Sequence, residues 1–360
     1  MEFRKNCFDP SKTPKFRVEL HVHLDGAIRP ETLWELSQRK GLFLHRSQEE
    51  LRRACVVESP SDLPTFLRPI TEYLPLVAGD AETIERIAFE FCEDAALQYV
   101  LYVEVRYSPH LMASEDFPPS KVVESVNRGL ERGRRAFGID VRSILCSIRG
   151  RPGWSREVVQ LCREYQDSGV VAIDIAGDAN GVVDTSVEDV EAFQVAYQLG
   201  IHRTVHAGED GPADQVKFAL DQLHAERIGH GYHVVENDAL YRRCLDSRVH
   251  LESCPHSSLL TGAVMNLRTK HPIVRYAEDG ANFSINRDDP TLIQKTLDDD
   301  YALLRSMGLS DVHFARANFN AAHSAFLPAE EKNELLQKLR RVYGAELKCL
   351  KNKETGVVTI

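Results

Sequence analysis

The sequence has no long apolar run, no closely paired cysteines and no excess of positive charge. No segment approaches the roughly 18 consecutive apolar residues of a membrane-spanning helix, and residues 1–14 lack the apolar core of a signal peptide. We therefore expect a cytoplasmic protein that does not bind membranes. A net charge of −10 over 360 residues would repel phosphate backbones, so nucleic acid is a poor candidate partner.

The eight cysteines are scattered along the chain with no C-x-x-C pair. In a reducing compartment they are expected to be free thiols, and neither a disulfide framework nor a zinc finger is indicated. The chain also has no low-complexity linker and no internal repeat. With 43% hydrophobic and 27% charged residues, its composition is typical of a globular protein with a large core.

Strand-like apolar runs alternate with amphipathic segments along most of the chain, which predicts a parallel sheet. The candidate strands are residues 16–24, 99–107, 140–148, 169–175, 201–206, 227–232, 249–254 and 281–286. They favour one α/β domain (residues 1–360), a (β/α)8 TIM-type barrel over about residues 15–320. The alternative is a doubly wound open sheet, but no glycine-rich phosphate loop follows an early strand. We expect a helical insertion over the barrel mouth (about residues 27–98) and a C-terminal helix (about residues 328–344).

Two histidines stand one residue apart in the first candidate strand, "VELHVHLDG" (18–26). Because residues i and i+2 of a strand face the same way, His21 and His23 would project together and could share a metal ion. The same pattern is also typical of two hydrogen-bonded histidines at the end of a core strand. Histidines or carboxylates recur at later strand ends, in "DIAGD", "VHAGED", "GHGYH" and "NRDDP". In a barrel those ends meet at one mouth, which predicts a shared metal-dependent site.

The residue types at these strand ends suit zinc, which takes neutral imidazoles and carboxylates when no cysteine is available. Three histidines and an aspartate would hold the ion and leave a position for water, whose pKa the ion lowers towards about 7. A further histidine could take a proton from that water, and a glutamate with a raised pKa could donate one. This chemistry is hydrolytic, but the residues alone leave an amide, a phosphoester and an exocyclic amine open as the group attacked.

Seven ordered segments resemble the adenosine deaminase family of the metal-dependent amidohydrolase superfamily, over about residues 15–343. They are "KFRVELHVHLDGAIRPETL", "YVEVRYSPHLMA", "VVAIDIAGDA", "IHRTVHAGED", "ERIGHGYHVVEND", "ESCPHSSLLTGA" and "ANFSINRDDP". The resemblance implies one zinc ion per chain. It implies hydrolytic deamination of adenosine and 2′-deoxyadenosine to inosine and 2′-deoxyinosine plus ammonia, by attack of zinc hydroxide on purine C6. It further implies purine salvage and a small purine nucleoside as the partner, whereas the sequence identifies no protein partner.

The resemblance also assigns catalytic and metal-binding roles to individual residues. The implied zinc ligands are His21, His23, His206 and Asp288. Glu209 would protonate purine N1, and His230 would orient and deprotonate the attacking water. Asp289 would accept a hydrogen bond from purine N7.

Substrate-binding roles follow from the same resemblance. Gly177 would offer its N–H to purine N3, and Asp25 together with His23 would hold the ribose 5′-hydroxyl. An apolar lid over the purine would comprise Leu63, Phe66 and Leu67. Such residues are equally typical of ordinary helix packing, so the lid is the least specific of these assignments.

Two residues depart from the pattern of the family. Arg287 stands before the Asp pair, where a small hydroxyl residue is usual, and His256 adds an imidazole after the seventh strand. Arg287 could lower the pKa of the neighbouring carboxylate, crowd the mouth or favour a phosphorylated substrate.

Three alternatives to adenosine deamination therefore stay open. The chain could deaminate adenine or a 6-substituted adenosine monophosphate, although the Asp25 carboxylate would repel a 5′-phosphate. It could be a nucleoside-binding or signalling homologue that has lost catalysis, although Glu209 and His230 are intact. It could hold a purely structural zinc, although structural sites are usually rich in cysteine.

Overall fold

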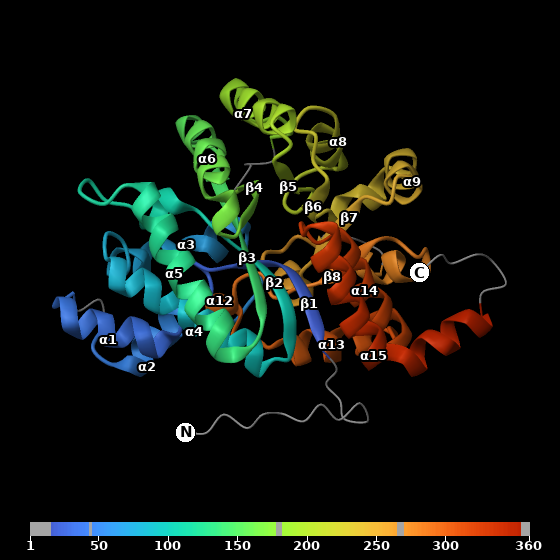
Figure 1. The fold of residues 1–360 in the computed structure, drawn as a ribbon, viewed down its shortest axis with the longest axis horizontal. Coiled ribbons are helices and arrows are strands. Elements are labelled where there is room, and N and C mark those ends of the chain that lie inside the picture. Colours follow the sequence, from blue (N-terminus) through green and yellow to red (C-terminus); the bar gives the residue numbers. More distant parts are fainter. Residues whose placement is uncertain (1–15, 43–44, 178–181, 265–269, 354–360) are drawn as a thin grey trace.

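A computed structural model describes residues 16–42, 45–177, 182–264 and 270–353. Within these ranges eight parallel strands follow one another in sequence order and curl into a nearly closed barrel (Figure 1). The strands are β1 (Arg17–His23), β2 (Val100–Tyr107), β3 (Asp140–Ile148), β4 (Val170–Ala176), β5 (His202–Ala207), β6 (Arg227–His230), β7 (His250–Ser253) and β8 (Phe283–Ile285). The predicted (β/α)8 architecture is confirmed, and each strand overlaps the range expected from the sequence.

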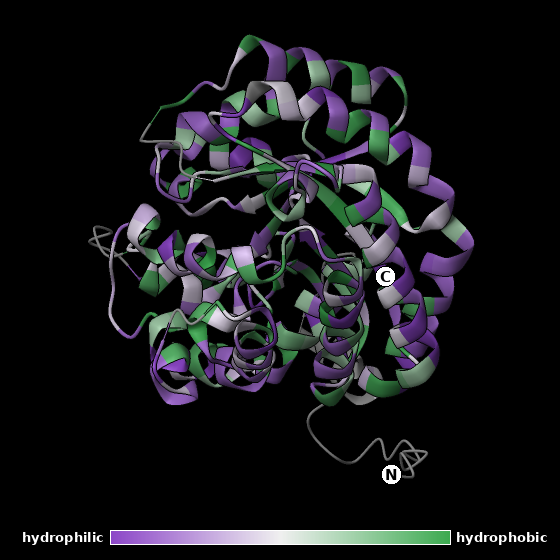
Figure 2. Ribbon diagram, turned by 90° about the vertical axis from the view of Figure 1, so that its left-hand side faces the viewer, coloured by the Kyte–Doolittle hydropathy of each residue, from purple (hydrophilic) through white to green (hydrophobic). Residues whose placement is uncertain are grey.

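Helices separate the strands and surround the barrel (Figure 1). Those between β1 and β2 are α1 (Pro30–Lys40), α2 (Gln48–Cys55), α3 (Leu63–Tyr73) and α4 (Ala81–Leu97). Those between β2 and β8 are α5 (Pro119–Phe137), α6 (Pro152–Tyr165), α7 (Val187–Gln198), α8 (Ala213–Asp221), α9 (Asp238–Asp246), α10 (Pro255–Leu260) and α11 (Pro272–Glu278). After β8 come α12 (Pro290–Ile293), α13 (Leu297–Ser306), α14 (Asp311–Ser324) and α15 (Ala329–Lys353). Figure 2 shows hydrophobic residues along the central strands and hydrophilic residues spread over the outer helices, as expected when helices cover a parallel sheet.

The insertion between β1 and β2 divides into a wall part and a mouth part. α4 packs along α5 so closely that a Cβ atom at Gly129 would lie 2.3 Å from the carbonyl oxygen of Glu85. Of α1–α4, only α3 lines the cavity at the mouth. Within the expected insertion, α3 therefore reaches the mouth, whereas α4 packs in the barrel wall.

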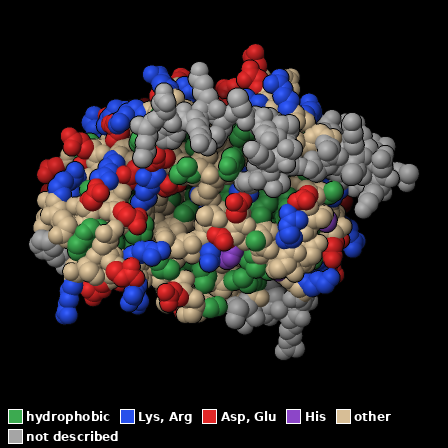
Figure 3. All heavy atoms as spheres, turned by 90° about the horizontal axis from the view of Figure 1, so that it is seen from below, with side chains coloured by type: hydrophobic (Ala, Val, Ile, Leu, Met, Phe, Trp, Pro, Cys, Tyr) green, Lys and Arg blue, Asp and Glu red, His purple; other side chains and the backbone are tan. Residues whose placement is uncertain are grey.

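The C-terminal helix begins where the sequence predicts but continues to Lys353. Gly344 does not end it, since an isolated glycine inside a helix costs only about 1 kcal/mol relative to alanine. Along the described ranges, no helix combines the length and the apolar character needed to cross a bilayer. The face seen from below mixes acidic and basic side chains (Figure 3).

The cysteines that the structure describes bear out the prediction of free thiols. They are buried and unpaired: Cys55, Cys92, Cys146, Cys162, Cys244 and Cys254. The side chains of Cys7 and Cys349 lie outside the described residues. Within the described part, the fold is therefore held together by burial of its core rather than by disulfide bonds.

Candidate active site

The expected metal ligands meet at the C-terminal ends of β1, β5 and β8. Nε2 of His21 and Nε2 of His23 lie 3.2 and 3.4 Å from Oδ1 of Asp288. Nε2 of His23 also lies 3.2 Å from Nε2 of His206. Ligand atoms about 2.0–2.1 Å from one tetrahedral ion are about 3.3–3.4 Å apart, so these separations fit atoms that share a metal.

His230 belongs to the same cluster. One ligand atom each from His21, His206, His230 and Asp288 lies within 4.8 Å of the others, so distance alone also allows His230 as a ligand. Nε2 of His230 lies 3.4 Å from Oε2 of Glu209, and its Nδ1 is buried without a hydrogen-bond partner. Both His230 and Asp288 have a left-handed backbone, with φ of +64° and +66°. Such strain in residues other than glycine is typical of functional sites.

Two buried carboxylates determine which nitrogen of each imidazole faces the cluster. Nδ1 of His21 lies 2.8 Å from Oε2 of Glu252, and Nδ1 of His206 lies 3.0 Å from Oδ2 of Asp174. A proton on Nδ1 in both rings leaves the Nε2 lone pair for the metal, the arrangement usual in metal sites. Nε2 of His21 is buried and has no hydrogen-bond partner in the described chain. A metal ion would satisfy this nitrogen, so the residues present fit the group.

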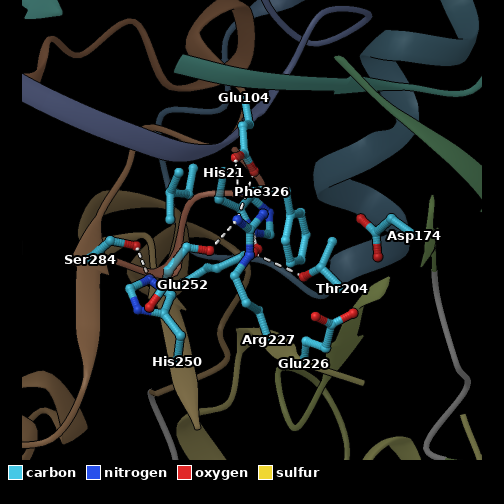
Figure 4. Close-up of polar contacts among 12 residues, drawn as sticks. His21, Glu104, Asp174, Thr204, Glu226, Arg227, His250, Glu252, Ser284 and Phe326 are labelled. Atoms are coloured by element: carbon cyan, nitrogen blue, oxygen red, sulfur yellow. Dashed lines mark hydrogen bonds and ion pairs between the residues drawn. The ribbon is translucent and has the colours of Figure 1, made fainter. Parts of the chain in front are cut away.

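Arg106 on β2 holds both of these carboxylates. Its Nη1 lies 2.7 Å from Oδ2 of Asp174 and its Nη2 lies 2.7 Å from Oε2 of Glu252. Burial opposes ionisation of Glu252, but Arg106 and Arg227 outweigh it and hold its pKa well below the usual range. Figure 4 shows Arg227 between Glu252 and Glu104. Its Nε lies 2.7 Å from Oε1 of Glu252, and its Nη1 lies 2.6 Å from Oε2 of Glu104.

This network of buried charged residues was not predicted from the sequence, although the sequence contains a signal of it. Glu104, Arg106, Arg227 and Glu252 are charged residues of the short strands β2, β6 and β7, whose residues are almost all buried. All four side chains are almost completely buried. Charged residues in buried strands are expected to be paired with one another, which would have placed them together in the barrel interior.

A cavity of about 450 Å³ opens beside the histidine cluster. Its size is within the range of small-molecule sites. The predicted site residues that line it are His23, Asp25, Leu63, Phe66, Leu67, Gly177, His206, Glu209, His230, Asp288 and Asp289. The remaining one, His21, is completely buried behind the cavity wall. Asp178, also noted near the end of the fourth strand, lies outside the described residues.

Three acids of the cavity have raised pKa values because they are buried. Burial, followed by the charges of Asp288 and Asp210, raises the pKa of Glu209 well above its usual range. Burial and the nearby charge of Asp288 do the same to the pKa of Asp289, whose Oδ1 has no partner. Burial raises the pKa of Asp25 to about 6. These shifts favour the protonated form of Glu209 and Asp289, whereas Asp25 is mostly ionised at neutral pH.

Burial has the opposite effect on three imidazoles of the site. It lowers the pKa of His23, His206 and His230. These rings are therefore neutral near pH 7 and present lone pairs. A neutral imidazole is the form that binds a metal or accepts a proton from water.

The two departures from the family pattern do not line the cavity. Arg287 faces away from the mouth, with Nη2 2.6 Å from Oε2 of Glu19. Nδ1 of His256 lies 2.8 Å from Oδ1 of Asp300. The expectation that Arg287 crowds the mouth or attracts a substrate phosphate is therefore wrong, because its guanidinium is engaged behind β1.

Comparison with known proteins agrees with this geometry. The family model described as adenosine deaminase matches residues 14–342. The adenosine deaminase of Mus musculus is 48% identical over 352 residues, covering 92% of this chain and 99% of that protein. Among solved structures, an adenine deaminase from Arthrobacter aurescens matches with a TM-score of 0.83 and 26% identity, covering 92% of this chain and 100% of that one. Arabidopsis ADAL complexed with IMP matches with a TM-score of 0.79 and 25% identity, covering 92% and 98%. From the site geometry and the extent of these matches, the chain belongs to the adenosine deaminase family.

Proposed function

We propose that this protein is a zinc-dependent deaminase of adenosine and 2′-deoxyadenosine, releasing the corresponding inosine and ammonia in purine salvage. The observation that carries the proposal is the convergence of three histidines and Asp288 beside a cavity that also holds Glu209. The name of the mouse relative supports adenosine as the substrate.

The residues assigned to the metal are His21, His23, His206 and Asp288. Three nitrogens and one carboxylate oxygen suit zinc better than magnesium or calcium, which prefer oxygen ligands. When bound, zinc lowers the pKa of a water molecule towards about 7 and so supplies the hydrolytic nucleophile. The remaining steps depend on side chains of the chain itself.

Two residues move the protons of the reaction. His230, kept neutral by burial, accepts a proton at Nε2 from the water that attacks purine C6. Glu209, whose pKa is raised by burial, donates its proton to purine N1 as the electrons of the C6–N1 double bond move onto N1. His230 then returns its proton to N6, the C6–N6 bond breaks and ammonia leaves. The C6 hydroxyl passes its remaining proton to Glu209, which leaves a carbonyl at C6 and both residues in their starting states.

Asp289 is assigned to donate a hydrogen bond to purine N7, whereas the family resemblance suggested that it accepts one. Purine N7 of adenosine carries a lone pair and no proton, so it can only accept. Burial and the charge of Asp288 raise the pKa of Asp289 and so favour a protonated carboxyl group, which is assigned to donate to N7. Glycine at position 26 makes room for it, since a Cβ atom there would lie 1.8 Å from Oδ1 of Asp289.

The other end of the cavity suits a ribose rather than a phosphate. Oδ1 of Asp25 lies 3.8 Å from Nδ1 of His23, and the two would share the 5′-hydroxyl. With a pKa of about 6, Asp25 is about nine-tenths ionised at pH 7 and repels a phosphate. The N–H of Gly177 is assigned to purine N3. The apolar residues of α3 are assigned to cover the ring and exclude water, namely Leu63, Phe66 and Leu67.

A deaminase of adenine or of a 6-substituted adenosine monophosphate is the second candidate. It is favoured by the structural neighbours, an adenine deaminase and an ADAL protein complexed with IMP. The decisive test measures kcat/KM side by side for adenosine, 2′-deoxyadenosine, adenine, adenosine monophosphate and its N6-methyl derivative. We expect the two nucleosides to be the best substrates, and a higher value for any of the other three would overturn the substrate assignment.

A further inference from the structure

The barrel is closed between β1 and β8 by side chains as well as by the backbone. The backbone N–H of His23 donates to the carbonyl of Asp288 at 2.8 Å, and the N–H of Asp288 donates to the carbonyl of His21 at 3.2 Å. Two residues before Asp288, Oδ1 of Asn286 accepts hydrogen bonds from the N–H groups of Leu20 and His21 on β1. The position of β8 against β1 therefore depends on particular side chains.

Arg287 makes a further contact across this junction, with Glu19 on β1. Its backbone N–H and its Nε each lie 2.9 Å from Oε1 of Glu19, and its Nη2 lies 2.6 Å from Oε2. The Arg287 and Glu19 side chains are 2% and 0% exposed. A forked, charge-assisted pair of this kind fixes geometry as well as contributing energy.

The pair lies directly behind the proposed metal ligands. Glu19 precedes His21 by two residues on β1, and Arg287 immediately precedes Asp288. Asp288 is held in a left-handed conformation with φ of +66°, which persists only where the surroundings enforce it. The contact between Arg287 and Glu19 helps to hold this conformation, because it fixes the position of the residue immediately before Asp288.

We propose that Glu19 and Arg287 are positioning residues for the metal site. They hold the turn after β8 against β1, so that Oδ1 of Asp288 lies close to both His21 and His23. This inference rests on the proposed metal-dependent function. The family usually has a small hydroxyl residue at the position of Arg287. The inference gives Arg287 a role in positioning the metal ligands instead of in substrate recognition.

A second arginine–glutamate pair, in which the glutamate is partly exposed, provides a control away from the metal site. The backbone N–H of Arg203 lies 3.3 Å from Oε1 of Glu226, and its Nη2 lies 2.8 Å from the same atom. The Arg203 side chain is also largely buried, at 7% exposure. Arg203 stands near the start of β5, whereas the ligand His206 stands near its end, about 10 Å further along the strand.

The experiment compares metal binding by the metal-free forms of the unsubstituted protein and of four variants: Arg287→Met, Arg287→Lys, Glu19→Gln/Arg287→Met and Arg203→Met. Zinc affinity is measured by competition with a chromophoric chelator, and ligand geometry by the visible spectrum of the cobalt(II)-loaded protein. Circular dichroism establishes that each variant is folded. The double variant removes both charges, so it leaves no buried charge unpaired.

We expect Arg287→Met and the double variant to bind zinc about 10–100-fold more weakly and to show an altered cobalt spectrum. Arg287→Lys, which keeps the charge but loses the planar fork, should give a smaller loss, and Arg203→Met should leave both readouts unchanged. Unchanged affinity and spectrum in folded Arg287→Met, or in the double or Lys variant if Arg287→Met does not fold, would overturn the inference. Failure of the unsubstituted protein to bind zinc would instead overturn the proposed function.

Discussion

Nδ1 of His21 lies 2.8 Å from Oε2 of Glu252, and both side chains are fully buried. The same carboxylate also accepts hydrogen bonds from Arg106, Arg227 and Thr204, so its four acceptor positions are filled. Glu252 is thereby held ionised, and it holds the proton of His21 on Nδ1. The interior of the barrel, rather than the loops at its mouth, determines which nitrogen of His21 faces the cluster.

Replacement of Glu252 should therefore weaken metal binding although Glu252 is not itself a metal ligand. We expect Glu252→Gln to lower zinc affinity about 10–100-fold, the usual effect of losing such a partner, as measured by chelator competition. Glu226→Gln is the matched control, because Glu226 contacts Nδ1 of His202 at 2.9 Å near the surface. Equal affinities for the two variants would contradict this role of Glu252.

The assignments of His23 and His230 are distinguished by separating metal binding from turnover. His23→Ala should weaken zinc binding, because Nε2 of His23 lies 3.2–3.4 Å from two other expected ligand atoms. His230→Ala should keep the metal and lose about 10²–10⁴-fold in kcat, as expected for loss of a general base. The converse pattern would make His230 the ligand and His23 the residue that acts on water.

The raised pKa of Glu209 predicts how activity depends on pH. Burial moves this pKa upwards, so the active, protonated form persists above the usual range of glutamate and is lost as the pH rises through the shifted value. We expect kcat/KM to fall on the alkaline side, and the residual activity of Glu209→Gln to lack that fall. An alkaline limb unchanged in the variant would assign it to another group.

The lid assignment is tested by comparing two buried phenylalanines. Phe66 on α3 is 0% exposed and lines the cavity, whereas Phe91 on α4 is 2% exposed and does not. Substitution of either by alanine should cost about 3–5 kcal/mol of stability, measured by denaturant unfolding. Only Phe66→Ala should also raise KM for adenosine. An equal KM in the two variants would mean that Phe66 only packs in the core and that α3 is not a lid over the purine.

Most of the fold and the first contacts of the site could be predicted because their signals are local. Strand runs alternating with helices give the barrel, and the barrel brings strand ends together, so His21, His206 and Asp288 could be grouped before any coordinates. The roles of Glu209 and His230 needed the family resemblance, since the residue types alone leave the attacked group open.

The direction of Arg287 and the partners of the imidazoles could not be predicted in the same way. Arg287 faces Glu19 beside a left-handed turn at Asp288, and no residue type signals such a turn at an aspartate. The pairing of His21 with Glu252 joins strands far apart in the sequence, so it depends on closure of the barrel. The charged residues inside these strands were a usable signal, but they do not specify which carboxylate meets which histidine.

The most direct test of the central claim is ammonia release from adenosine by the zinc-loaded protein, followed together with the ultraviolet change from adenine to hypoxanthine. The account predicts one ammonia per inosine formed, loss of both signals after chelation and their return with zinc. It also predicts that Glu209→Gln binds zinc normally and turns over about 10²–10⁴-fold more slowly. Absence of ammonia from the zinc-loaded, folded protein, or full activity in Glu209→Gln, would contradict the account.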